Sequence, residues 1–76
     1  MELTLYQFEG CPFCAKVRAK LAEKRLKYSK VEVPRDDDLM WNLLHEKAGV
    51  WTVPVLKAGD RWIGESGDIV AFLDAL

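Results

Sequence analysis

Cys11-Pro12-Phe13-Cys14 contains both cysteines of the chain and lies between two runs of different character. Residues 3–8 alternate and include aromatic and β-branched types, as in a strand, whereas residues 11–26 favour a helix. Proline suits the first helical position, because a backbone N–H there has no partner within the helix. A thiol at this junction lies beside unpaired N–H groups, and the positive end of the helix dipole favours the thiolate. We therefore expect a redox centre with Cys11 as the nucleophile.

The size and net charge of the chain limit the number of domains and the kinds of partner that can be expected. The 76 residues predict one small domain over 1–76, and half of them are hydrophobic, enough for a core without metals. A disulfide that closes so short a loop stabilises a fold little, which argues against a structural role for the cysteines. The formal net charge of −1 gives no electrostatic reason to expect nucleic acid or an anionic membrane as a partner.

The location expected for the chain also bears on the cysteines. No apolar run approaches the roughly 20 residues that cross a bilayer. The first four residues, Met-Glu-Leu-Thr, lack the basic start of a signal peptide. We therefore expect a cytoplasmic protein, where a CxxC pair is more often catalytic or metal-binding than structural.

The rest of the sequence alternates between strand and helix patterns. Further strands are expected at 28–33, 52–57 and 61–63. A second helix is expected to begin among the aspartates at 36–38 and to end at Gly49, and a third to follow Ser66. The first two strands should be parallel and the last two antiparallel. This order, β-α-β-α-β-β-α, predicts an α/β thioredoxin fold: a four-stranded mixed sheet with helices on both faces.

The chain resembles the glutaredoxins, and specifically the N-terminal thioredoxin-like domain of transferase-like glutaredoxins and glutathione transferases. The likeness rests on four segments that span nearly the whole chain: Leu5-Tyr6 before the CxxC, Lys16-Val17-Arg18, Thr52-Val53-Pro54, and Glu65-Ser66-Gly67-Asp68-Ile69-Val70.

The resemblance implies a glutathione-dependent thiol–disulfide oxidoreductase, with glutathione as co-substrate and disulfide-containing proteins as substrates. Cys11 would attack a disulfide or a glutathione mixed disulfide. Cys14, more shielded inside the helix, would stay protonated until it resolves the intermediate. A monomer is expected, with no metal.

The resemblance also implies how glutathione is bound. Pro54 would be cis, and the backbone of Val53 would pair with the cysteinyl part of the peptide. The turn at Glu65-Ser66 would receive the γ-glutamyl carboxylate at a helix N-terminus, and Asp68 would receive the α-ammonium group. Ser66 is expected to cap that helix. The full expected substrate-binding set is Pro12, Phe13, Trp51, Thr52, Val53, Pro54, Glu65, Ser66 and Asp68.

Two positions differ from the family pattern. Many small glutaredoxins carry a Lys three residues before the first cysteine and a basic residue two before the Thr-Val-Pro, facing the glycine carboxylate of glutathione. Here these positions hold Phe8 and Val50. A redoxin reduced by a flavin disulfide reductase or by another low-molecular-weight thiol therefore stays a second hypothesis. A third is a non-enzymatic iron–sulfur cluster carrier, which Pro12 and the second thiol disfavour by analogy.

The remaining residues of interest have structural interpretations. Trp51 is expected to form an apolar wall of the groove, and Phe13 to be exposed beside the thiolate. We expect His45 and the pair Lys16 and Arg18 on solvated helix faces. The aspartates at 36–38 indicate a helix start rather than a metal site, and the tryptophans at 41 and 62 should be partly buried.

Overall fold

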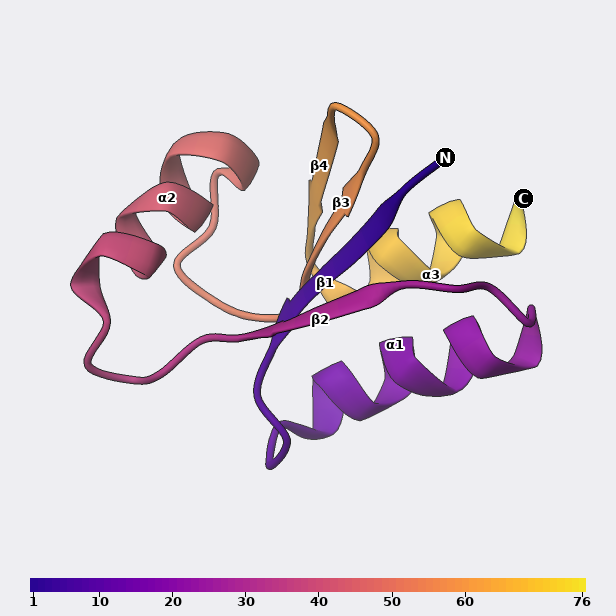
Figure 1. Ribbon diagram of the computed structural model, residues 1–76, viewed down its shortest axis with the longest axis horizontal. Helices are drawn as coiled ribbons and strands as arrows, with labels where there is room; N and C mark the ends of the chain where they lie inside the picture. The colour runs from indigo at the N-terminus through magenta and orange to yellow at the C-terminus, as the bar shows by residue number, and fades with distance from the viewer.

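The computed structural model describes residues 1–76 and has the predicted order of elements (Figure 1). Along the chain these are β1 (Leu3–Gln7), α1 (Pro12–Glu23), β2 (Ser29–Glu32), α2 (Asp38–Ala48), β3 (Val55–Ala58), β4 (Arg61–Gly64) and α3 (Ser66–Asp74). None of the three helices is both long enough and apolar enough to cross a membrane.

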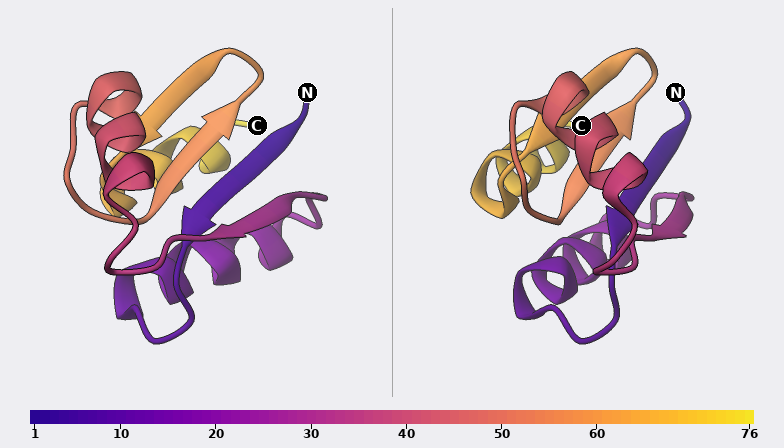
Figure 2. Two further views of the ribbon diagram at one scale, coloured as in Figure 1. Left: turned by 60° about the vertical axis from the view of Figure 1, so that its left-hand side comes forward. Right: turned by 90° about the vertical axis from the view of Figure 1, so that its left-hand side faces the viewer.

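One sheet joins the four strands in the order β2-β1-β3-β4. β1 runs parallel to β2 and antiparallel to β3, and β3 and β4 form an antiparallel hairpin, as predicted. The register places Leu5 opposite Leu56, which in turn lies opposite Ile63. Helices α1 and α3 cover one face of the sheet and α2 the other (Figure 2). The chain therefore has the thioredoxin fold.

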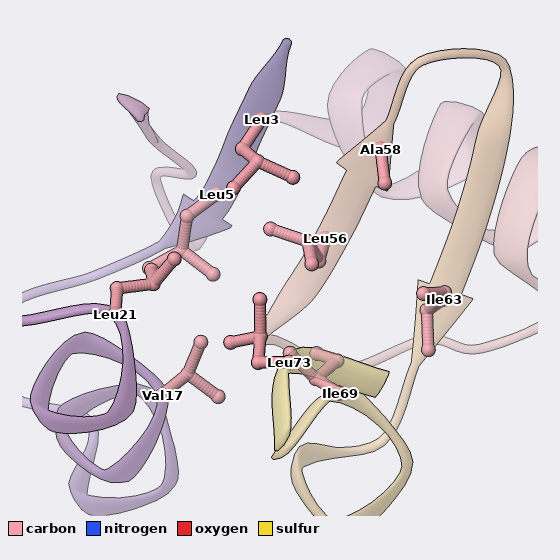
Figure 3. Close-up of a cluster of buried hydrophobic side chains, with 9 residues drawn as sticks. All are labelled: Leu3, Leu5, Val17, Leu21, Leu56, Ala58, Ile63, Ile69 and Leu73. Carbon is pink, nitrogen blue, oxygen red and sulfur yellow. The ribbon is translucent and has the colours of Figure 1, made fainter. Parts of the chain in front are cut away.

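The larger core lies between the sheet and the helices α1 and α3 (Figure 3). Alternate residues of β1 point to this face, and each helix contributes residues four apart, as a helical stripe requires. Burying one such aliphatic side chain contributes roughly 1.5–3 kcal/mol. The nine buried residues of this core are Leu3, Leu5, Val17, Leu21, Leu56, Ala58, Ile63, Ile69 and Leu73.

A second core contains both cysteines. It joins the start of α1 to the segment before β3 and to α2, through the buried residues Cys11, Cys14, Val33, Leu44, Val53 and Val55. On the same side of the sheet the rings of Tyr6 and Trp62 stack with centroids 5.4 Å apart. Trp62 and Trp41 are both half-buried, as expected. The sulfur atoms are thus part of the hydrophobic interior at one end of the molecule.

Element boundaries differ from the prediction by more than one residue in two places. α1 ends at Glu23 rather than near residue 26, because Arg25 adopts a left-handed conformation with φ of 55° that a helix does not continue through. β3 begins at Val55 rather than at residue 52, since Pro54 has no N–H to donate to a strand ladder. The predicted end of α2 is confirmed: Gly49 is its C-cap with φ of 75°.

Candidate functional site

Cys11 caps α1 with its own sulfur. The residue is the N-cap, with φ of −84° and ψ of 117°, and Pro12 begins the helix. The backbone N–H of Cys14 donates a hydrogen bond to Cys11 Sγ over 3.3 Å. This bond takes up one of the four N–H groups that the first turn of a helix leaves unpaired. The sulfur therefore lies at the strand-to-helix junction that the sequence predicted.

The two thiols differ in access to solvent. Both are free; Cys11 retains 7 % of its surface, and Cys14 retains none. Cys11 is therefore the more accessible thiol, but it is recessed and not openly exposed. Phe13, between the two cysteines, is 54 % exposed, as expected. A partner would reach the recessed sulfur past this ring.

Cys14 is held in its protonated form. Burial, together with the hydrogen bond to Cys11, raises the pKa of the Cys14 thiol to about 12. The backbone of Phe8 and the positive charge of Arg18 lower the same pKa, but by less. At neutral pH the thiol keeps its proton, as expected for a resolving cysteine.

The segment before β3 brings a carbonyl group to the sulfur of Cys11. The Val53–Pro54 peptide bond is cis, as the resemblance implied. The carbonyl oxygen of Val53 lies 3.9 Å from Cys11 Sγ, although 42 positions separate the two residues. Val53 and Pro54 are both buried, so this backbone is fixed against the start of α1.

A pocket of about 290 Å³ opens beside this segment. It collects six of the nine expected substrate-binding residues from α1, the segment before β3 and the start of α3. Its lining residues are Phe13, Thr52, Val53, Pro54, Glu65 and Ser66.

The other three expected binding residues lie outside this pocket. Pro12 is exposed in the first turn of α1. Trp51 is 57 % exposed, and its ring stacks on the imidazole of His45 with centroids 4.0 Å apart. His45 is exposed on α2 as expected, but it is covered on this side by the indole ring. Asp68 borders a separate hollow between β4 and α3.

The start of α3 corrects the expected cap. Glu65, not Ser66, is the N-cap residue, and no side chain makes a capping hydrogen bond there. The reason is that the chain enters α3 through Glu65 in a left-handed conformation with φ of 67°, which leaves Ser66 as the first helical residue. The N–H groups of the first turn therefore remain free of a side-chain cap at the edge of the pocket.

Two basic residues near the cysteines make contacts that the sequence did not predict. Arg18 is not on a solvated face: its guanidinium donates a hydrogen bond to the buried side chain of Gln7 and lies 3.7 Å from Glu9. Arg35 lies over the ring of Phe8, 5.8 Å from its centroid. Its positive charge therefore lies beside Phe8, the position at which many small glutaredoxins carry a Lys and this chain does not. No group of three or more His, Cys, Asp or Glu side chains lies close enough together to bind a metal ion.

The sheet order, the buried CxxC at a helix start and the cis-proline segment beside it define a thioredoxin-like domain. The chain belongs to the family of glutathione S-transferase N-terminal domains, whose family model matches residues 5–76.

Solved structures and curated proteins agree with this family. Glutathione transferase E6 from Drosophila melanogaster is 31 % identical, with a TM-score of 0.88 over 97 % of this chain and 34 % of that chain. A glutathione transferase homologue from Drosophila mojavensis, solved with bound glutathione, is 28 % identical, with a TM-score of 0.86 and the same coverage. Prostaglandin E synthase 2 from Danio rerio is 61 % identical over 33 residues, which are 43 % of this chain and 9 % of that protein. The chain thus spans about a third of the transferases and about a tenth of the synthase.

Proposed function

We propose that this domain is a glutathione-dependent thiol–disulfide oxidoreductase that reduces protein disulfides and glutathione mixed disulfides. The observation that carries the proposal is the position of Cys11 Sγ. It accepts the N–H of Cys14 and lies 3.9 Å from the carbonyl oxygen of Val53. Val53 and Phe13 also line the pocket that could hold the other half of a mixed disulfide.

The reaction would proceed by two thiol–disulfide exchanges. The Cys11 thiolate attacks one sulfur of the substrate disulfide, forms a mixed disulfide and releases the other sulfur as a thiolate, which takes up a proton. Cys14 then loses its proton and attacks Cys11 Sγ. This step releases the second substrate thiol and leaves a Cys11–Cys14 disulfide, so two electrons have moved to the substrate. Two molecules of glutathione return the enzyme to the dithiol and leave as one glutathione disulfide.

The pocket offers contacts that suit glutathione. The backbone of Val53 would pair with the cysteinyl part of the peptide, next to Cys11 Sγ. The N–H groups at the start of α3, beside Glu65 and Ser66, suit the γ-glutamyl carboxylate, because no side chain caps them. Phe13 and Thr52 would form the remaining walls. Family relatives support this assignment, since one of them was solved with bound glutathione.

The two ends of the peptide need charges from outside the pocket lining. Arg35, held over Phe8, is our candidate partner for the glycine carboxylate, because Phe8 O accepts the N–H of Cys11 and so lies beside the nucleophile. Asp68, in the first turn of α3, is our candidate for the α-ammonium group. Pro12, in the first turn of α1, and Trp51, stacked on His45, do not line the pocket.

A coupled assay tests the proposal. The protein is supplied with a glutathione mixed disulfide and an excess of glutathione, with glutathione reductase and NADPH to report turnover. A parallel reaction replaces glutathione and its reductase with thioredoxin reductase. We expect NADPH oxidation in the first reaction only. Turnover that depends on thioredoxin reductase alone would support the second hypothesis, the redoxin, and would overturn the proposed electron donor.

A further inference from the structure

Gln7 is a fully buried polar residue close to the redox centre, and its side-chain amide has several charged partners. Its Nε2 donates hydrogen bonds to Glu9 over 2.7 Å and to Glu32 over 2.5 Å. Its Oε1 accepts a hydrogen bond from the guanidinium of Arg18. An amide whose two ends are both engaged has one preferred orientation, so the acceptor is kept toward Arg18.

Arg18 lies on the cysteine-bearing face of α1. It follows Cys14 by four residues, so the two side chains are neighbours one helical turn apart. Only 23 % of the Arg18 side chain is exposed, so solvent and salt screen its charge less than that of a surface arginine. That charge opposes the effect of burial on the pKa of Cys14.

We propose that Arg18, held in place by Gln7, is a positioning residue that speeds the attack of Cys14 on the mixed disulfide. The inference rests on the proposed dithiol mechanism and assigns a residue to its second step. Negative charge must form on Cys14 inside the protein during that step. A cation held in advance one helical turn from the sulfur stabilises this charge without having to reorganise.

The charged side chains around Gln7 weaken the effect of Arg18 on Cys14 but do not cancel it. Glu9 and Glu32 surround the Gln7 amide and offset part of the Arg18 charge. Glu9 is 65 % exposed and also lies 3.8 Å from Lys30, which reduces its influence. Cys11 carries no charge while it is in the mixed disulfide, so it does not oppose ionisation of Cys14 at that stage.

A symmetrical aromatic disulfide that releases coloured thionitrobenzoate separates the two steps. Attack by Cys11 forms a mixed disulfide and releases one thionitrobenzoate. Cys14 then loses a proton to solvent and attacks Cys11 Sγ, which closes the protein disulfide and releases the second thionitrobenzoate. Stopped-flow absorbance on the reduced full chain gives the rate of each release.

We expect Arg18→Gln to slow the second release by about threefold and to change the first by less than about twofold, since a partly offset charge one helical turn away shifts the thiol pKa by less than about one unit and the nucleophilicity of the sulfur changes in the opposite sense. Arg18→Lys should restore most of the second rate, because it keeps the charge. Glu9→Gln removes an opposing carboxylate and should make the second release faster. Lys20→Gln is the matched control: Lys20 lies on the same helix but pairs with Glu23 and Asp74. It should change neither rate.

Each outcome bears on one hypothesis. A second release that is unchanged in Arg18→Gln and in Glu9→Gln would overturn the role of Arg18. Equal slowing of both releases would also overturn it, because a purely structural effect acts on both steps. Should Arg18→Gln fail to fold, Glu9→Gln decides alone, since Glu9 is at the surface. A wild-type protein that makes no second release would instead contradict the dithiol mechanism itself.

Discussion

The backbone N–H of Cys14 points at the sulfur of Cys11, so the proposed resolving residue also holds the proposed nucleophile in place. Any substitution of Cys14 that keeps the helix keeps this bond, because the donor is a main-chain group. The two roles of residue 14, as a thiol and as a backbone donor, can therefore be separated by mutation.

The first prediction uses this separation. Cys11→Ser should abolish turnover of both substrate classes, by at least about a hundredfold, because a serine hydroxyl is not ionised at neutral pH and cannot replace a thiolate. Cys14→Ser should lose the reduction of protein disulfides but keep that of glutathione mixed disulfides, because a second glutathione can attack the Cys11–glutathione mixed disulfide in place of Cys14. The coupled assay with each substrate measures this. Retained activity in Cys11→Ser would contradict the assignment of the nucleophile.

A second prediction follows from the pKa of Cys14. Burial raises it to about 12 in the folded protein, whereas an unfolded chain releases the same proton near about pH 8.5. The contribution of the protonated Cys14 thiol to the free energy of unfolding is complete below about pH 8.5. It is lost as the pH rises towards 12, because over this range the unfolded state binds fewer protons than the folded state. The slope expected from this group is about 1.4 kcal/mol per pH unit.

Urea unfolding at about pH 8 and about pH 10 measures this slope. Cys14→Ser is the control, since it has no thiol to titrate at that position. The variant should lose less stability between the two pH values than the wild-type protein. Equal losses in both would show that Cys14 does not titrate as the structure requires.

A third prediction concerns Arg35. Arg35→Gln should raise the KM for glutathione about threefold to tenfold, because one partly screened ion pair is lost. The KM for γ-glutamylcysteine, which lacks the glycine residue, should change less. Lys57→Gln is a matched control, because Lys57 in β3 also lies over a ring, that of Trp62, but lines neither the pocket nor the hollow next to Asp68. Equal effects on the two thiols would argue against contact between Arg35 and the glycine end.

A fourth prediction tests the close packing of Gly64 in β4 against Val50, which comes shortly before β3 in the chain. A Cβ added at Gly64 would lie 2.9 Å and 3.0 Å from the two methyl groups of Val50. Gly64→Ala should therefore destabilise the fold by about 1–3 kcal/mol, as overpacking does. Val50→Ala in the same chain should recover part of this loss.

Gly67→Ala provides the comparison for that pair. An added Cβ at Gly67 meets nothing within 4 Å, and the residue lies in α3. Alanine favours a helix over glycine by about 1 kcal/mol, so this variant should be as stable as the wild-type protein or more so. Urea unfolding measures the free energy of unfolding of four proteins: the wild-type protein, Gly64→Ala, Gly64→Ala with Val50→Ala, and Gly67→Ala. A Gly64→Ala variant with wild-type stability would show that Val50 can move away at no cost.

Local patterns were sufficient to predict the order of elements and the pairing of strands. The alternation in β1 and the four-residue spacing of Ile69 and Leu73 each encode one buried face. The position of Cys11 could also be predicted, because Pro12 marks the start of α1.

The network around Gln7 could not be predicted in the same way. The alternation in β1 places Gln7 on the same face as Leu3 and Leu5, but only the arrival of α1 and β2 shows which charged partners surround its amide. Arg35 was missed for a similar reason, since its contact with Phe8 joins residues from separate loops. The cap of α3 depended on the backbone conformation of Glu65, which side-chain preferences alone do not give.

Both sulfur atoms belong to the same hydrophobic cluster as Val33, Leu44 and Val55. Converting the dithiol to a disulfide therefore alters contacts inside the folded interior. A thermodynamic cycle then links the midpoint potential of the cysteine pair to the difference in the free energy of unfolding between the oxidised and reduced forms. Evolution could tune the potential of such a domain from α2, through residues such as Leu44 that never meet a substrate.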